Sequence, residues 1–222
     1  IPDIVAEYFR IMNEVENEAI LVALCAIVEN YSEQIVPIAP MMVDHLSKVF
    51  LTYSAAGMDD EEAAFAATQC LDTLTSIVDA LDPDNGGNVE TLRTVETVML
   101  PIIQKAVATE DAFEYLENGV QFMTQFIFYG TDISPGMWTL CGPLLVSLDT
   151  WAYDYINEIM NPLLNYMSKD IATFLSLSHN GIPLIQLLLK VIEKSLASDD
   201  SERELEAKSG ANLLNCLLLC VK

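Results

Sequence analysis

Basic residues are scarce in this 222-residue sequence: 10 lysines and arginines stand against 33 aspartates and glutamates, for a formal net charge of −23. Nucleic acid is therefore an unfavourable partner, because proteins bind phosphates through clusters of lysine and arginine. Anionic membrane surfaces are unfavourable for the same reason. Positively charged proteins are the natural partners, since the acidic field reaches about 8 Å at physiological salt. The alternative is that the acidity simply keeps an apolar chain soluble.

Histidine is also rare, and no pattern of catalytic residues is present. His45 and His179 are the two histidines, and neither has the spacing of a metal site or a catalytic triad. No glycine-rich phosphate-binding loop occurs. The segment from Asp82 begins like a calcium loop, but it has Gly86 at the fifth position and Arg93 where a bidentate glutamate is needed. We therefore expect no catalytic residues, no metal site and no cofactor, and we do not expect an enzyme.

Cysteines are few and form no CxxC motif; the five occupy positions 25, 70, 141, 216 and 220. An odd number of cysteines within apolar stretches predicts reduced, buried residues of an intracellular protein. The chain begins with Ile1 instead of methionine, which suggests a fragment or a processed product, and it has no cationic start of a signal peptide. Its longest apolar runs contain Pro143 and Lys190 and are too short to span a membrane, so we expect a soluble protein.

Strand signals are almost absent, whereas helical spacing recurs along the chain. Apolar residues that step by four and three positions share one face of a helix, as Ala67, Leu71, Leu74 and Val78 do. This spacing and the turn residues between the segments predict helices over 3–12, 17–31, 35–57, 59–81, 88–108, 110–129, 135–148, 151–168, 181–197 and 201–221, with a short apolar turn near 171–177.

Short connections between these helices make neighbouring helices antiparallel. The repeat of helix pairs is close to the roughly 40–47 residues of HEAT repeats. We therefore predict an all-α fold, an α-solenoid of antiparallel HEAT-repeat helix pairs that forms a segment of a superhelix. Residues 1–222 form one such segment, with about five pairs at approximately 3–31, 35–81, 88–129, 135–168 and 181–221.

Several segments resemble the carboxy-terminal half of receptors of the importin-β (karyopherin-β) family, in the importin-seven/eight branch. They occur in family order over nearly the whole chain: 12–17 (MNEVEN), 31–39 (YSEQIVPIA), 134–138 (SPGMW), 160–166 (MNPLLNY) and the closing helix from Ala207 to Cys220. The resemblance implies stacked HEAT repeats whose second helices line a concave side that holds protein cargo. It also implies that apolar grooves between the first helices bind Phe-Gly repeats of nucleoporins.

The resemblance further implies a receptor that shuttles between cytoplasm and nucleus through nuclear pores. RanGTP releases import cargo from such receptors through amino-terminal repeats, so Ran binding is implied for the full-length receptor and is doubtful for this segment. The function that follows is binding of basic cargo, such as ribosomal proteins or histones, for nuclear import. The alternative is a HEAT-repeat scaffold that organises a protein complex without a transport role.

The candidate cargo-binding residues are acids on the second helices of the predicted pairs. Each pair of acids is spaced to share one helical face: Asp72 with Asp79, Glu114 with Glu117, and Asp154 with Glu158. Stacked helices would align these acids in one strip, where exposed pairs worth about 0.2–1 kcal/mol each act collectively. The alternative is an ordinary solvated face.

A further acidic cluster lies at a predicted helix start: Asp59, Asp60, Glu61 and Glu62. It is a candidate contact for cargo. The favoured explanation is a capping box formed by Asp59 and Glu62, together with the attraction of carboxylates to the positive end of the helix dipole.

Five aromatic residues are candidates for Phe-Gly grooves: Phe122, Phe126, Tyr129, Trp138 and Trp151. Core packing is the favoured interpretation for most of them, because large aromatic side chains on helices are usually buried.

Overall fold

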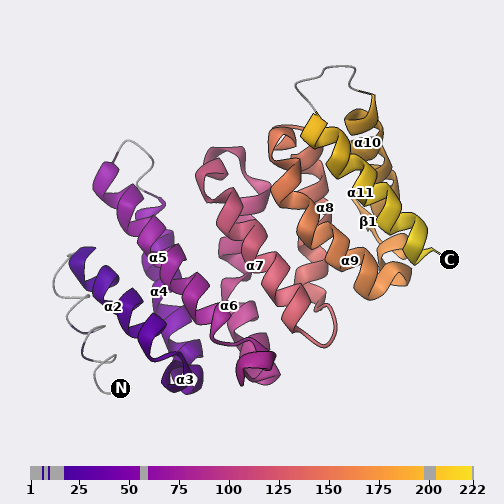
Figure 1. The fold of residues 1–222 in the computed structure, drawn as a ribbon. Helices are drawn as coiled ribbons and strands as arrows, with labels where there is room; N and C mark the ends of the chain where they lie inside the picture. Colours follow the sequence, from indigo (N-terminus) through magenta and orange to yellow (C-terminus); the bar gives the residue numbers. More distant parts are fainter. Residues whose placement is uncertain (1–6, 8–9, 11–17, 56–59, 198–203, 222) are drawn as a thin grey trace. The chain divides into compact units, whose positions relative to one another are not determined.

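The computed structural model describes residues 7, 10, 18–55, 60–197 and 204–221. Over these residues the protein is helical apart from one short β-hairpin, and the chain forms two compact units, residues 1–102 and 103–222 (Figure 1). The predicted all-α fold of helical repeats is confirmed. None of the helices among the described residues is long and apolar enough to cross a membrane.

The α-helices are α2 (Glu18–Asn30), α3 (Ser32–Ile35), α4 (Ala39–Tyr53), α5 (Glu61–Asp79), α6 (Val89–Ala108), α7 (Leu116–Tyr129), α8 (Pro135–Asp149), α9 (Ile156–Ser176), α10 (Leu184–Leu196) and α11 (Glu204–Cys220). Short 3₁₀ turns are η1 (Val36–Ile38), η2 (Pro83–Asn85), η3 (Glu110–Tyr115) and η4 (Tyr153–Tyr155). The hairpin consists of β1 (Ser178–His179) and β2 (Ile182–Pro183).

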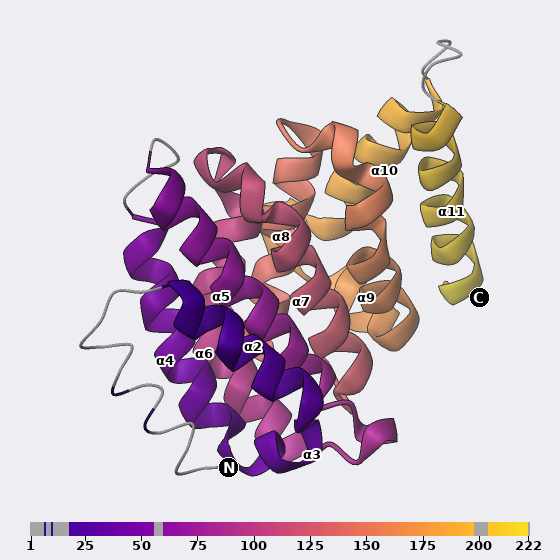
Figure 2. The ribbon, with the colours of Figure 1, turned by 60° about the vertical axis from the view of Figure 1, so that its left-hand side comes forward.

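In the first unit, α5 packs against both α2 and α4 (Figure 1, Figure 2). The predicted apolar stripe of α5 is buried, from Ala67 to Val78. Asp60 caps the helix, because its extended backbone lets the side chain accept a hydrogen bond of 3.1 Å from the amide of Ala63. The cap is therefore Asp60 instead of the predicted Asp59, which lies outside the described residues together with Gly57.

In the second unit, helices two apart in sequence pack together. α7 contacts α9 and α9 contacts α11, while α8 contacts α10. These contacts form two layers, α7–α9–α11 and α8–α10, in which α10 also packs on α11 and α8 on α9 (Figure 1, Figure 2). Layers of this kind arise when helical hairpins stack on one another, as in α-solenoids.

Buried hydrogen bonds hold these layers in register. The hydroxyl of Ser147 on α8 donates to the carbonyl of Val107 on α6 at 2.8 Å. The hydroxyl of Tyr166 on α9 donates to the carbonyl of Met137 on α8 at 2.5 Å, and Tyr166 is completely buried. The Trp138 and Tyr166 rings lie 4.9 Å apart. A buried aromatic with its polar atom satisfied fixes both the position and the rotation of a neighbouring helix.

A lysine joins α9 to the end of α7. The Lys169 amine donates to the carbonyls of Ile127, Phe128 and Gly130, of which the Phe128 contact measures 3.1 Å. The last carbonyls of a helix lack partners within the helix, and they carry its partial negative charge. Lys169 therefore caps α7 from the adjacent helix.

The hairpin corrects one of our expectations, that a helix begins at 181. β1 and β2 pair antiparallel, and α10 begins at Leu184. The turn residues Asn180 and Gly181 have φ angles of 51° and 80°. Positive φ at both positions produces the tight turn that Asn-Gly favours between antiparallel strands. The strands contain two residues each, which is too short for an alternating pattern.

Four other boundaries differ from the predicted ones. The predicted helix over 35–57 is divided into η1 (Val36–Ile38) and α4 (Ala39–Tyr53), because Pro37 and Pro40 lack the amide hydrogens that a continuous helix needs. The predicted apolar turn near 171–177 is the end of α9, which is kinked at Asp170. The predicted helices 110–129 and 151–168 begin with the 3₁₀ turns η3 and η4. Ala112, Tyr115 and Tyr153 are already buried in these 3₁₀ turns, and regular α-helical hydrogen bonding begins at Leu116 and Ile156.

Candidate protein-binding surfaces

The predicted acidic residues are divided between the two units. Asp72 and Asp79 lie exposed on α5 in the first unit. The carboxylate of Asp72 accepts a hydrogen bond of 3.4 Å from Gln69, and partial burial raises the pKa of Asp72. Glu61 and Glu62 are exposed in the first turn of the same helix, next to the Asp60 cap.

The other acidic pairs lie in the second unit, where each is divided between a 3₁₀ turn and a helix. Glu114 is half-buried in η3, whereas Glu117 is exposed in the first turn of α7. Asp154 is exposed in η4, and Glu158 is exposed in the first turn of α9. Burial and the neighbouring carboxylate of Glu114 raise the pKa of Tyr115.

The packing of α7 on α9 brings one acid from each pair to the same groove. The lining residues of this α7–α9 groove, whose volume is 290 Å³, are Glu117, Val120, Gln121, Thr124, Gln125, Glu158 and Asn161. Neither Glu117 nor Glu158 forms an ion pair within the described part of the chain. Two carboxylates and several amide and hydroxyl groups therefore line one concave surface.

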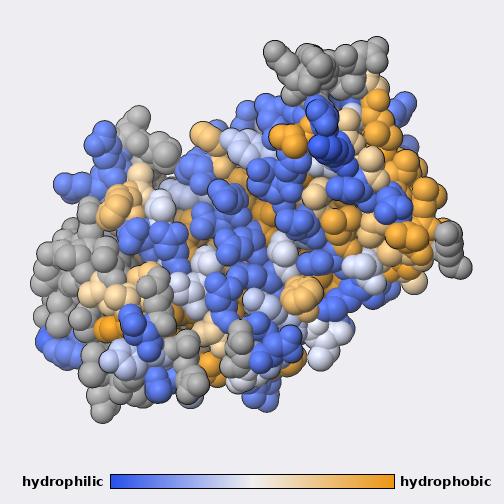
Figure 3. All heavy atoms as spheres, in the orientation of Figure 1, coloured by the Kyte–Doolittle hydropathy of each residue, from blue (hydrophilic) through white to orange (hydrophobic). Residues whose placement is uncertain are grey.

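Cations are scarce on the layer that carries this groove. Lys169 and Lys208 are the basic residues of α7, α9 and α11. The amine of Lys169 is bound to the carbonyls at the end of α7, and Lys208 forms an exposed ion pair with Glu204. Figure 3 shows hydrophilic side chains gathered over α7 and the adjoining part of α9.

The α8–α10 layer has a different charge pattern. Lys190 forms an ion pair of 2.5 Å with Asp149, and Lys194 donates to the backbone carbonyl of Asp149 at 3.1 Å. The Lys194 amine also lies 4.0 Å from the centre of the Tyr153 ring. The two cations of α10 are thus engaged with α8 and η4.

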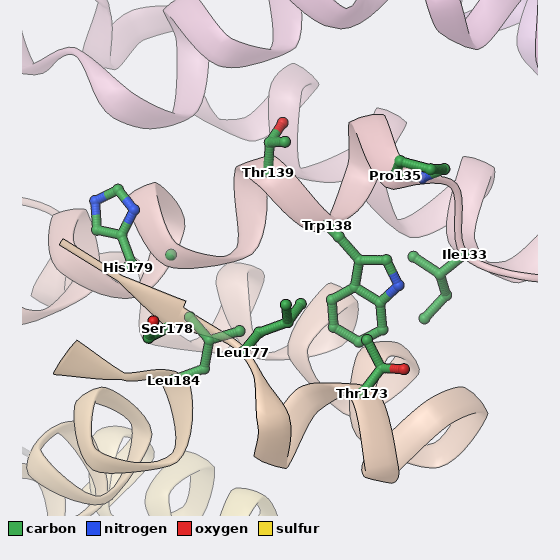
Figure 4. Close-up of a pocket in the computed structure, with 10 residues that line it drawn as sticks. Ile133, Pro135, Trp138, Thr139, Thr173, Leu177, Ser178, His179 and Leu184 are labelled. Atoms are coloured by element: carbon green, nitrogen blue, oxygen red, sulfur yellow. The ribbon is translucent and has the colours of Figure 1, made fainter. Parts of the chain in front are cut away.

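An apolar pocket of 540 Å³ lies between α8, the end of α9 and the hairpin (Figure 4). The lining residues of this α8–hairpin pocket are Ile133, Pro135, Trp138, Thr139, Gly142, Thr173, Leu177, Ser178, His179 and Leu184. The Trp138 ring points toward Thr173 and Leu177 in Figure 4. Gly142 permits the hairpin to approach α8, because a Cβ at this position would lie 2.4 Å from the Cβ of His179.

The aromatic candidates separate into core and surface residues. Phe122 and Phe126 are fully buried, as expected for core residues. Trp138 is half-buried and lines the α8–hairpin pocket. Trp151 and Tyr129 are half-buried and do not line it. This pocket was not predicted from the sequence. The Asn-Gly dipeptide at 180–181 could have predicted the hairpin, whose residues Ser178 and His179 form one side of the pocket.

Comparisons with known proteins connect these surfaces to a family. No protein-family model and no solved structure matches the chain. Among curated proteins, an importin beta-like SAD2 homolog of Arabidopsis thaliana is 30% identical over an alignment of 215 residues that covers 92% of this chain. A probable importin-7 homolog of Dictyostelium discoideum is 26% identical over 98% of the chain, and importin-8 of Homo sapiens is 25% identical over 99%.

The chain belongs to the importin-β family, in the branch of importins 7 and 8. The chain covers 20% of the length of each of these three relatives, about a fifth of the whole protein. The similarity extends over nearly the whole chain, so both units of this importin-β family chain are included in it.

The two surfaces of this importin-β family chain suit different chemical groups. The α7–α9 groove offers carboxylates to a cation, whereas the α8–hairpin pocket offers apolar side chains to a ring or an aliphatic group. Among the described residues, no group of three or more His, Cys, Asp and Glu side chains is placed to hold a metal ion.

Proposed function

We propose that this chain is part of a nuclear transport receptor and that its α7–α9 groove binds lysine and arginine side chains of basic protein cargo. The observation that carries the proposal is the position of Glu117 and Glu158, which line one groove without an ion pair in the described residues. Its relatives are named importins, and on this basis the receptor is proposed to move between cytoplasm and nucleus with its cargo. Import is the proposed direction, with Ran acting on other repeats of the longer receptor.

Charge supports this assignment. The chain has a net charge of −23, so a basic segment is attracted before it makes contact. Opposite charges at the surface interact over about 8 Å at physiological salt. This distance is similar to the spacing of two packed helices, so acids on both α7 and α9 can act on one basic side chain. Each exposed ion pair contributes only about 0.5 kcal/mol, so recognition requires several acids of the α7–α9 surface together. Asp154 and Glu114, near the starts of these helices, are proposed to contribute to the same surface.

Removing both groove carboxylates is expected to weaken cargo binding about fivefold, since two exposed pairs contribute on the order of 1 kcal/mol. The double variant Glu117→Gln, Glu158→Gln keeps the size of both side chains. The measurement is fluorescence anisotropy of a labelled lysine- and arginine-rich peptide at low and physiological salt.

The matched control is Glu193→Gln, which removes an exposed carboxylate from α10. It should leave affinity unchanged within twofold. Weakening by the control in proportion to the one charge that it removes, against the two charges removed by the double variant, would show that the total charge, and not the groove, attracts the peptide. Binding that is insensitive to salt would contradict the cargo role of this surface altogether.

We further propose that the α8–hairpin pocket receives the phenylalanine ring of nucleoporin Phe-Gly repeats. Its apolar lining and the half-buried Trp138 support this assignment, because an aromatic ring gains from both burial and ring contacts. The glycine of the repeat would allow the backbone to turn at the pocket mouth.

A Phe-Gly peptide is expected to change the emission of Trp138 on binding. The variant Thr139→Glu places a carboxylate in the lining and should weaken binding about tenfold, because desolvating a charge without a partner costs at least 1–3 kcal/mol. Val146→Glu is the matched control, since Val146 is exposed on the same helix and does not line the pocket. Unchanged affinity in Thr139→Glu would refute this pocket as the Phe-Gly site.

A further inference from the structure

Two thiols face one another on α11. The sulfur atoms of Cys216 and Cys220 lie 3.9 Å apart, one helical turn from each other. Both side chains are half-buried, so solvent reaches them, and the Cys216 sulfur lies 4.0 Å from the carbonyl oxygen of Leu164 on α9. This contrasts with Cys70 and Cys141, which are buried, whereas we expected all five cysteines to be core residues.

The helix prevents these two thiols from joining directly. A disulfide requires Cβ atoms about 3.5–4.5 Å apart and sulfurs about 2.05 Å apart. Residues four apart on a helix have Cβ atoms about 5–6 Å apart. A disulfide between Cys216 and Cys220 would therefore distort the last turns of α11, where Leu213 and Leu217 are buried in the core.

A single atom between the sulfurs fits this geometry. Two metal–thiolate bonds of about 2.3 Å place sulfurs up to about 4.6 Å apart, which includes the observed 3.9 Å as a bent arrangement. Structural zinc needs four ligands, and no cluster of three or more His, Cys, Asp and Glu groups suited to a metal occurs in the described ranges. Soft thiolates prefer Cu(I), which does not require such a cluster.

We propose that Cys216 and Cys220 form a two-thiolate site for a soft monovalent metal ion, Cu(I) being the physiological ion of this class. Binding exchanges two S–H bonds for two S–Cu bonds, and the two protons pass to solvent. The ion keeps its oxidation state, and the complex has one net negative charge. This site is separate from the α7–α9 groove and from the α8–hairpin pocket, so it is independent of the proposed cargo and nucleoporin binding.

The test uses the whole chain, reduced and free of oxygen, titrated with Cu(I) held by the coloured chelator bicinchoninate. We expect one Cu(I) per chain at this site. Cys216→Ser and Cys220→Ser should each weaken its binding more than about a hundredfold, since loss of a direct ligand exceeds the 10–100-fold cost of losing an outer partner. Cys25→Ser removes another half-buried thiol and should leave the affinity unchanged.

A second measurement covers the case in which a variant fails to fold. In the unaltered chain, bound Cu(I) should protect Cys216 and Cys220 from alkylation, as read by mass spectrometry, while Cys25 remains reactive. Protection of Cys25 instead, affinity that both serine variants retain, or oxidation of the pair to a disulfide in intact α11 would overturn the proposal.

Discussion

Phe126→Ala is expected to lower the free energy of unfolding of residues 103–222 by about 3–5 kcal/mol. Phe126 lies in the last turn of α7 and is fully buried, so truncation leaves a cavity between packed helices. Both tryptophans of the chain, Trp138 and Trp151, lie in the same unit. Denaturant titration followed by tryptophan emission therefore reports on this unit alone.

Phe128→Ala is the matched control for this substitution. Phe128 lies two residues further along α7 and is 66% exposed, so its truncation should change stability by less than about 0.5 kcal/mol. The account would be contradicted if Phe126→Ala left stability unchanged but abolished the binding of Phe-Gly peptides. Phe126 would then be part of a peptide-binding groove and not of the core.

Lys169→Met is expected to destabilise the same unit by about 2–3 kcal/mol, because hydrogen bonds from a charged donor are worth about 1.5–3 kcal/mol each and several carbonyls lose their partner. Methionine keeps most of the aliphatic stem, so the loss comes from the amine that caps α7. For a unit of this size we expect a fall of several degrees in Tm, about 2–4 °C for each kcal/mol. Differential scanning calorimetry measures it.

Lys208→Met provides the comparison. Lys208 forms an ion pair of 3.2 Å with Glu204, and both side chains are well exposed. Its loss should therefore cost less than about 0.5 kcal/mol. Similar falls in Tm for the two variants would mean that a lost positive charge in an acidic chain, and not the cap on α7, causes the destabilisation.

The presence of most helices was predicted well, although several of their starts differ from the observed ones. The predicted helix over 135–148 begins where expected: α8 starts at Pro135, and the Ser134 hydroxyl accepts a hydrogen bond of 3.0 Å from the amide of Met137. The stripe of α5 was also predicted, because a period of 3.6 residues is a local property of the chain. The cap of α5 was misplaced by one residue, which is the usual uncertainty of a helix boundary.

Contacts between distant segments could not be predicted in this way. The groove depends on the pairing of α7 with α9, which places Glu117 beside Glu158, and helical periodicity does not specify which helices pair. The same holds for Lys169 and the end of α7. The hairpin, in contrast, had a local signal in Asn180-Gly181, which the strong apolar pattern after it concealed.

Family resemblance implied the same stacked repeats that the helix spacing predicts, and the two layers of the second unit agree with that arrangement. It did not indicate how the acids are distributed, because Asp72 and Asp79 lie in the other unit and Glu114 is half-buried. Their predicted role in cargo binding stays a prediction, as does that of Asp60, Glu61 and Glu62.

Zero-length carbodiimide crosslinking to a lysine-rich peptide tests the cargo surface most directly, because it joins a lysine amine only to a carboxylate in contact with it. Mass spectrometry should find the peptide on Glu117 and Glu158 in preference to the exposed Glu193 of α10, and the crosslinks should disappear at high salt. Crosslinks spread evenly over the exposed acids, or concentrated on Glu193, would contradict a cargo site in the α7–α9 groove.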